Sequence, residues 1–379
     1  MKISISRNEL YNKLSVLQKI INSKCPLEIT QNFLFLVENS ELKMMTTDLE
    51  TTLSTSIKLE NSEGEMACAM PTKLMDVLKE LPEQIITLNI TESDDKVQVK
   101  LTNESNSYHS DFYAFPAGNR GEEFPQPKEF EGEVHSLNLS NEILFNGVNH
   151  TIFATAEDAA RPTMTGIFFD IKPDNITIVG TDAHKLVKYE VSAQNFGFEG
   201  SFILPKKPAL TLKAILTRSS DMVGVQYNDK NIVFKMEDFE LNSRTIEGRF
   251  PNYNAVIPNN QFKAIIDRSS ILGAIRRVKV FSNQGTGLIK FVFANNNLEV
   301  STQDIDFSTS AKEDIVCQYG SEPISIGFKA VLFEEILSNI TDDQISIELE
   351  DSSKPGIVVP FEQGENEELV MLLMPMFLQ

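Results

Sequence analysis

The chain has 379 residues, of which 41% are hydrophobic and 23% are charged, so it has enough apolar side chains for two or three folded domains. This composition excludes a largely disordered protein, and the lack of any apolar run of roughly 18 to 20 residues excludes an integral membrane protein. With 34 lysines and arginines against 54 aspartates and glutamates, the formal net charge is −20, which taken alone argues against nucleic-acid binding.

The N-terminal residues 1–6 alternate like a strand and form no signal-peptide apolar segment, so we expect a cytoplasmic protein. Cys25, Cys68 and Cys317 are too far apart for a disulfide framework or a zinc site, which also suits a reducing compartment. The 4 histidines are scattered. We therefore expect no metal site and no cofactor.

A strand–turn–strand pattern that ends in an aspartate occurs three times along the chain. It covers residues 33–48, 166–182 and 287–304, and the closing aspartates are Asp48, Asp182 and Asp304. A pattern of this kind predicts a β-hairpin. The first two aspartates are 134 residues apart, and the last two are 122 residues apart.

Helical segments recur at the same two offsets. Pro71, Pro205 and Gly327 begin three apolar-periodic segments and are again separated by 134 and 122 residues, which unrelated features would rarely share. A capping box at Ser6 and an N-cap at Asp267 mark the starts of two other helices. We expect helices at residues 7–24, 71–81, 140–152, 205–218, 268–281 and 327–339.

Each copy of the repeat therefore consists of a strand, a helix, a hairpin, a strand, a second helix and further strands. We predict three domains of the α+β class with similar folds. Their boundaries fall in polar or proline-marked stretches, which gives domains of residues 1–128, 129–258 and 259–379.

Positive charge is concentrated in the predicted helices. They contain 15 basic and 6 acidic residues, a charge of +9, while the rest of the chain carries −29. Lysines on one helix are ordinarily solvated surface, but their concentration on a repeated element favours a basic face that contacts phosphates. Helix 140–152 has no lysine or arginine. The candidate DNA-contacting residues of the helices are Lys73, Lys206, Lys207, Lys213, Arg276, Arg277 and Lys279, with Arg218 beside them.

The sequence lacks the motifs of phosphate-cradling loops, paired-ligand metal sites and nucleophile elbows. It has no tryptophan and its 7 tyrosines are dispersed, so no stacking platform for single strands is expected. No helix presents an evident set of base-reading side chains. We therefore expect contact with the phosphate backbone, without sequence specificity.

Five short segments carry a family resemblance. They are Thr47–Glu50 (TDLE), Gly180–Leu186 (GTDAHKL), Gly248–Tyr253 (GRFPNY), Phe281–Asn283 (FSN) and Leu373–Met376 (LMPM). In this order, and on a threefold repeat, they make the whole chain resemble the bacterial sliding clamps, the β subunits of the replicative DNA polymerase III. The resemblance implies a processivity factor that is not an enzyme. It also implies a head-to-tail homodimeric ring of DNA-clamp domains, each with two helices packed on antiparallel sheets, that encircles double-stranded DNA and slides along it.

The resemblance implies a dimer interface and one further DNA contact. The interface is expected between Ser110 and Phe112 of one copy and Val280 and Phe281 of the other, although both aromatic side chains could equally lie in the core of their own domains. Lys24 is expected to contact DNA from a loop.

The resemblance also implies a partner-binding pocket between the second and third domains. Its ligands would be short extended peptides of the polymerase α subunit, the clamp loader and other replication and repair proteins. Methionine and leucine side chains would make such a surface adaptable to several partners. By motif matching, the pocket consists of Arg161, Met164, Thr181, Ala183, His184, Lys185, Leu186, Pro251, Val256, Leu372, Leu373, Met374, Pro375, Met376 and Phe377.

Some positions depart from the pattern of the family. Pro162 and Thr163 stand where many relatives have an aromatic pair that contacts DNA. Ala255 and Phe377 stand where relatives can have basic residues at the pocket rim or near the end of the chain. We expect a more apolar pocket whose preferred peptide differs.

Three alternatives remain open from the residues alone. An enzyme could use Asp182 with His184, or Asp48, and would lose turnover in a His184→Ala variant. The sequence favours a strand-end turn residue at His184, because no nucleophile motif accompanies it. A general interaction scaffold would never meet DNA. Leu372, Leu373 and Met374 could belong to a final core strand and not to a pocket.

Overall fold

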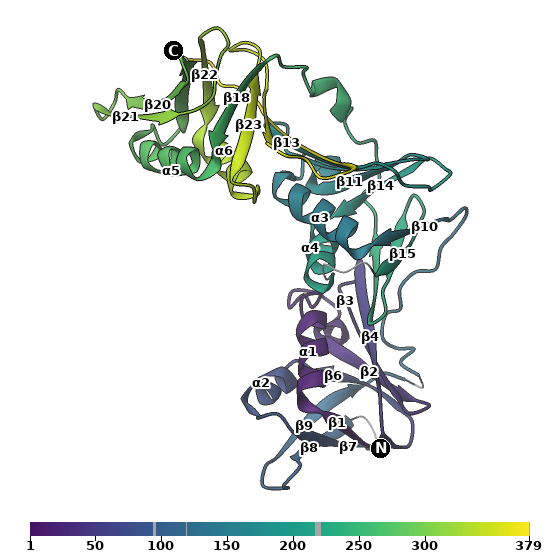
Figure 1. Ribbon diagram of the computed structural model, residues 1–379. Coiled ribbons are helices and arrows are strands. Elements are labelled where there is room, and N and C mark those ends of the chain that lie inside the picture. The colour runs from purple at the N-terminus through teal and green to yellow at the C-terminus, as the bar shows by residue number, and fades with distance from the viewer. Residues whose placement is uncertain (94–95, 119, 217–220, 379) are drawn as a thin grey trace. The chain divides into compact units, whose positions relative to one another are not determined.

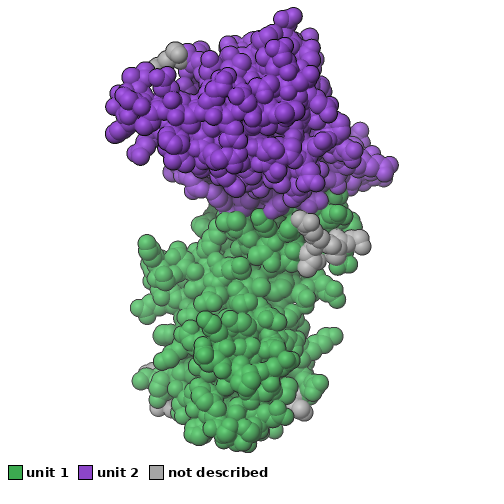
Figure 2. Space-filling view, turned by 60° about the vertical axis from the view of Figure 1, so that its left-hand side comes forward, with its two compact units in different colours: residues 1–145, 207–245 green, residues 146–206, 246–379 purple. Residues whose placement is uncertain are grey.

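The computed structural model describes residues 1–93, 96–118, 120–216 and 221–378 (Figure 1). They form two compact units, one of residues 1–145 and 207–245 and the other of residues 146–206 and 246–379 (Figure 2). The second repeat contributes to both units. It does so because its strands extend the sheet of the first repeat and also that of the third.

One antiparallel sheet runs through the first unit. β17 (Phe239–Arg244) pairs with β4 (Thr51–Lys58), so that strands of the second repeat continue the sheet of the first. The 13 described strands follow the order β10 (His135–Ser140), β15 (Met222–Tyr227), β16 (Asn231–Lys235), β17, β4, β3 (Glu41–Thr47), β2 (Asn32–Glu38), β6 (Met66–Pro71), β9 (His109–Pro116), β8 (Lys96–Asn103), β7 (Ile85–Ser93), β1 (Lys2–Ser6) and β5 (Asn61–Glu63).

The second unit contains two antiparallel sheets. In the first of them β13 (Lys185–Val191) pairs with β25 (Glu367–Leu373), which joins the second repeat to the third. This 8-stranded sheet has the order β14 (Gly200–Pro205), β11 (Gly166–Ile171), β12 (Ile176–Thr181), β13, β25, β24 (Gly356–Pro360), β23 (Gln344–Leu349) and β18 (Phe262–Asp267). The 4-stranded sheet has the order β21 (Thr309–Val316), β20 (Asn297–Asp304), β19 (Leu288–Ala294) and β22 (Ile324–Lys329).

The six predicted helices are present. They are α1 (Arg7–Leu17), α2 (Lys73–Glu80), α3 (Asn141–Thr151), α4 (Lys206–Ile215), α5 (Arg268–Val278) and α6 (Ala330–Ser338). Both predicted N-caps form, because Ser6 Oγ accepts from the Glu9 N–H at 3.4 Å and Asp267 Oδ1 accepts from the Ser270 N–H at 2.7 Å. Leu10, Leu14 and Leu17, spaced for one helical face, bury that face of α1. None of the helices in the described ranges has the length and hydropathy needed to cross a bilayer.

The helices are shorter than predicted. α1 ends at Leu17, and residues 18–20 and 23–24 form turns. In the second turn the Asn22 side chain accepts the Lys24 N–H at 3.0 Å, a local bond that competes with a helical pattern. Gly327 lies in β22, where it pairs with Lys290, so α6 starts later than expected. Arg218, predicted among the helical cations, lies outside the described residues.

Candidate functional site

The turn between β12 and β13 brings together several residues of the predicted pocket. Thr181 Oγ1 donates to the Lys185 carbonyl at 2.7 Å and accepts from the Ala183 N–H at 3.2 Å. Asp182 Oδ1 accepts from the N–H groups of His184 and Lys185, both at 2.8 Å. Ala183 has φ 73°, a left-handed conformation that disfavours a residue with a Cβ. These side-chain bonds hold the turn in a shape that it would not adopt alone.

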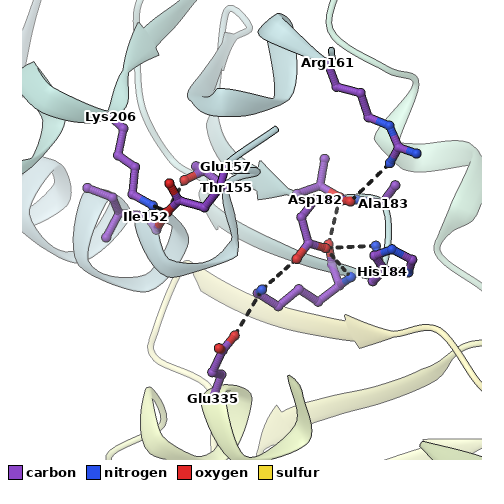
Figure 3. A network of polar contacts seen from close by, with 11 residues as sticks. Ile152, Thr155, Glu157, Arg161, Asp182, Ala183, His184, Lys206 and Glu335 are labelled. Carbon is purple, nitrogen blue, oxygen red and sulfur yellow. Dashed lines mark hydrogen bonds and ion pairs between the residues drawn. The ribbon is translucent and has the colours of Figure 1, made fainter. Parts of the chain in front are cut away.

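Lys185 connects this turn to helix α6 by binding Asp182 and Glu335, which Figure 3 labels. Its Nζ lies 2.7 Å from Asp182 Oδ2 and 3.0 Å from Glu335 Oε2, and its side chain is only 6% exposed. Burial alone would raise the pKa of Asp182, but the hydrogen bonds from Lys185 and His184 outweigh it and lower that pKa. Burial would lower the pKa of Lys185, but the two carboxylates raise it. Asp182 and Lys185 are therefore both charged at neutral pH.

An apolar cluster lies beneath the turn. Leu186 and Leu372 face each other across the β13–β25 pair and pack with Phe250 and Tyr253. The Tyr253 hydroxyl donates to Asp170 Oδ2 at 2.6 Å. Burial and this bond raise the pKa of Tyr253 well above its ordinary value. The bond fixes the segment after Phe250 to strand β11.

The C-terminal segment is held by the backbone at two points. The Met374 N–H donates to the His184 carbonyl at 2.9 Å, and the Met376 N–H donates to the Gly327 carbonyl at 2.7 Å. One bond connects the segment to the second repeat and the other connects it to the third. Residues 374–376 therefore pass directly beside the turn.

Only some of the apolar side chains in the predicted pocket are exposed. Val256, Met374 and Phe377 are 48%, 40% and 90% exposed. Leu372 and Leu373 are 2% and 1% exposed, because both lie inside the sheet as part of β25. Leu372 packs in the apolar cluster beneath the turn, whereas Leu373, the next residue of the strand, points to the opposite face of the sheet. Val256, Met374 and Phe377 are the large exposed apolar side chains of the predicted pocket.

Of the remaining predicted pocket residues, Arg161 contacts the same turn. Arg161 is exposed, and its Nη1 donates to the Asp182 carbonyl at 3.4 Å. The Met164 N–H donates to the Arg161 carbonyl at 3.0 Å. Met164 and Pro251 are half-buried. All fifteen predicted pocket residues belong to the second unit.

His184 and Asp182 do not form a catalytic pair in this turn. The contact between them runs from the backbone N–H of His184 to Asp182 Oδ1, and Asp182 Oδ2 is bound by Lys185. Within the described ranges, no group of three or more His, Cys, Asp or Glu side chains is placed to hold a metal ion.

Most of the predicted DNA-contacting cations are paired with carboxylates. Arg277 is bidentate on Glu313, at 2.9 and 2.6 Å. Glu334 forms ion pairs with both Arg276, whose Nε lies 2.9 Å from Oε1, and Lys279. Two further pairs are Lys206–Glu157 and Lys207–Asp48. Among the described residues, no ion pair forms at Lys24, Lys73 or Lys213.

The predicted interface residues differ in exposure. Val280 and Phe281 follow α5 and are 73% and 44% exposed, so neither lies in the core of its own domain. Ser110 and Phe112 are half-buried on β9. The sequence reasoning missed Ile305 and Phe307, which are 78% and 76% exposed in the turn between β20 and β21. Apolar residues in a turn, where polar ones are usual, were the available signal. Counted from the turn aspartate to the first residue of the next strand, this turn is also two residues longer than its counterparts in the other repeats.

Three sequence models of one family match the chain in succession. They describe the N-terminal, central and C-terminal domains of the DNA polymerase III beta subunit and match residues 1–116, 138–252 and 254–377. The prediction of three repeated domains of one fold is confirmed by these matches.

Relatives and solved structures are similar along the whole chain. The beta sliding clamp of Treponema pallidum is 28% identical over 99% of both chains, and that of Synechococcus elongatus is 27% identical over 98% of both. A crystal structure of the sliding clamp of Pseudomonas aeruginosa bound to griselimycin matches with a TM-score of 0.91 at 25% identity, over 100% of both chains.

Proposed function

The chain belongs to the family of bacterial DNA polymerase III β subunits, the sliding clamps, and on this premise we propose that two copies close head to tail into a ring around duplex DNA and tether the polymerase. Members of the family are processivity factors without catalytic activity, so the alternative of an enzyme built on Asp182 and His184 is excluded. We further propose that the protein works in the cytoplasm. The three cysteines are all free and buried, which suits that compartment.

The continuity of the sheets carries the proposal of a ring. At both joints inside the chain, the last strand of one repeat pairs with the strand that follows the turn aspartate of the preceding repeat. These pairs are β17 with β4 and β25 with β13. The corresponding strands that are left over are β21, at the edge of its sheet, and β9, which meets β6 only through Phe115 and Pro116. A second copy would supply what each strand lacks.

The repeat also gives the register of the closing pair. Leu241 pairs with Leu53, and Met371 pairs with Val187. In each repeat, the paired residues can be followed strand by strand from the first strand to the last. By this count, Ser110 has the place in the first repeat that Leu241 has in the second and Met371 has in the third. Ala311 occupies the place of Leu53 and Val187, because its partner Thr302 lies two residues before the turn aspartate. We therefore place Ser110 opposite Ala311 of the partner subunit. This pairing would also cover Val280, Phe281, Ile305 and Phe307.

The paired cations support weak contact with DNA. A phosphate that approaches Arg277 or Lys207 must compete with a carboxylate already bound there, whereas Lys24 and Lys213 can meet it directly. A ring that cannot leave closed DNA needs no tight grip, and weak contacts allow sliding.

Three features support a peptide-docking site. They are the polar turn, the buried leucine cluster beneath it, and the exposed side chains of Met374, Val256 and Phe377. An extended peptide would place apolar side chains against Met374 and Phe377, with its orientation fixed by the polar groups of the turn. Partners of this kind are the polymerase α subunit, the clamp loader and other replication and repair proteins.

The mass in solution together with small-angle scattering tests the proposed ring. We expect a mass of two chains, 42.6 kDa each, and a scattering envelope with a central hole wide enough for duplex DNA. A monomer, or a dimer without a hole, would contradict the proposal.

A further inference from the structure

The three turn aspartates bind their own turns in the same way. Asp48 Oδ1 accepts from the N–H groups of Glu50 and Thr51, at 3.1 and 2.7 Å. Asp304 Oδ1 accepts from those of Asp306 and Phe307, at 3.0 and 3.3 Å. Together with the corresponding bonds of Asp182, these contacts occupy one oxygen of each carboxylate. The second oxygen, Oδ2, is left for another partner.

At the two joints inside the chain, Oδ2 binds a lysine that reaches the second helix of the next repeat. Asp48 Oδ2 meets Lys207 at the start of α4, and the same Nζ donates to the Ile20 carbonyl at 2.7 Å. Asp182 Oδ2 meets Lys185, which in turn meets Glu335 on α6. The aspartate of one repeat is thus connected to the second helix of the following repeat in both cases.

Asp304 lacks such a cation among the residues that the structure describes, although it is only 4% exposed. A buried carboxylate that has no counter-ion is destabilising, which makes a positive partner favourable. The exposed Ile305 and Phe307 beside Asp304 form an apolar surface of the kind that another molecule covers.

We propose that Asp304 Oδ2 binds the ammonium group of Lys73 from the second copy of this chain. Lys73 begins α2, the second helix of the first repeat, and precedes Lys207 by the same 134 residues that separate Asp48 from Asp182. It is exposed and has no carboxylate within the described chain. The proposal rests on the proposed ring, and it gives Lys73 a role at the joint between subunits in place of a phosphate contact.

A charge-reversal cycle in the full-length chain tests this pair. Lys73→Glu sets a carboxylate against Asp304, and we expect the dimer dissociation constant to rise about tenfold for each interface, or about a hundredfold for a ring with two. Asp304→Asn keeps the Oδ1 acceptor that the turn needs but removes the charge. In that background, Lys73→Glu should change the dissociation constant by less than about threefold, because the repulsion is gone.

Lys43→Glu is the matched control, since Lys43 is an exposed lysine of the same repeat within β3. We expect this control to leave the dissociation constant unchanged, and circular dichroism should show that every variant is folded. If Lys73→Glu changes the dissociation constant equally in both backgrounds, or in neither, the proposed ion pair is wrong. The proposed ring would still hold in that case, provided that the wild-type chain is a dimer. A monomeric wild-type chain would overturn the ring and the pair together.

Discussion

Lys185 holds two carboxylates from different elements, so its effect on the site is structural as well as electrostatic. Without it, Asp182 and Glu335 would repel each other across the join between the β12–β13 turn and α6. The turn itself carries Ala183 in a left-handed conformation and depends on Asp182 Oδ1 to close. The shape of this turn therefore depends on the charges of Asp182, Lys185 and Glu335.

The Asp182 contribution to stability should depend on pH. The pKa of Asp182 is below its ordinary value of 3.8 in the folded chain, so its stabilising effect is present above that value and is lost as the pH falls through the folded pKa. We expect Asp182→Asn to lower the free energy of unfolding by about 2 kcal/mol at pH 7, because Lys185 loses a buried partner. The difference from the wild type should shrink towards pH 3.

Urea unfolding at both pH values measures this effect. Asp174→Asn, at an exposed carboxylate of the same repeat, is the control and should change little at either pH. A deficit for Asp182→Asn that stays constant from pH 7 to pH 3 would show that the ion pair is not its cause.

The Tyr253 hydroxyl should stabilise the segment that carries Val256. Tyr253→Phe keeps the packed ring and removes only the bond to Asp170, so we expect a loss of about 1 kcal/mol in the free energy of unfolding. Combining it with Asp170→Asn gives a double-mutant cycle. Additive losses in that cycle would show that the two side chains do not act as a pair.

At the scale of elements, periodic patterns were readable from the sequence and distant partners were not. The six helices and three hairpins followed from local spacing, and the caps at Ser6 and Asp267 formed as expected. The carboxylates on the helical cations could not be anticipated. Glu313 lies 36 residues beyond Arg277 and reaches it only through the packing of β21 against α5.

The predicted pocket shows the same limit. Motif matching named the residues of one site, but it could not distinguish exposed Met374 from buried Leu373, its neighbour at the end of β25. Strand pairing decides that difference, because Leu373 lies opposite Lys185 within the sheet. The longer turn with Ile305 and Phe307 could be recognised in the sequence. Whether its side chains are exposed depends on how the surrounding chain folds, which the sequence pattern does not give.

The predicted DNA-contacting cations that form no ion pair within the described ranges should matter most for DNA. We expect Lys24→Glu combined with Lys213→Glu to weaken binding of short duplex DNA more than Arg276→Glu combined with Arg277→Glu, because the two arginines already hold carboxylates. Fluorescence anisotropy across a salt series measures both the affinity and the number of phosphates contacted. Lys43→Glu combined with Lys58→Glu, on the strands β3 and β4, is the charge-matched control. A larger effect of the arginine pair would show that their ion pairs open on DNA.

The C-terminal segment should decide partner binding without affecting dimerisation. We expect deletion of residues 374–379 to abolish binding of a polymerase-derived peptide, and Phe377→Ala to weaken it at least about tenfold, since Phe377 is 90% exposed beside the site. Phe361→Ala removes an equally large exposed side chain of the same unit and should have no effect. Calorimetric titration gives both affinities. Normal binding by the truncated chain would refute the site.

At the scale of the whole molecule, the chain uses one joint repeatedly. A strand pair and an aspartate at the end of a hairpin connect the first repeat to the second and the second to the third. The same parts are left unmatched at β9 and β21. A closed ring of two copies satisfies both ends, whereas a lone chain leaves an edge strand and an apolar turn exposed.

Retention on DNA tests the ring most directly. The protein, assembled by its loader on nicked circular DNA and separated from free protein by gel filtration, should stay with the circle and leave within minutes once a restriction enzyme makes the DNA linear. Blocking both ends of the linear DNA with bound protein should restore retention. Equal loss from circular and linear DNA would contradict a ring that encircles the duplex.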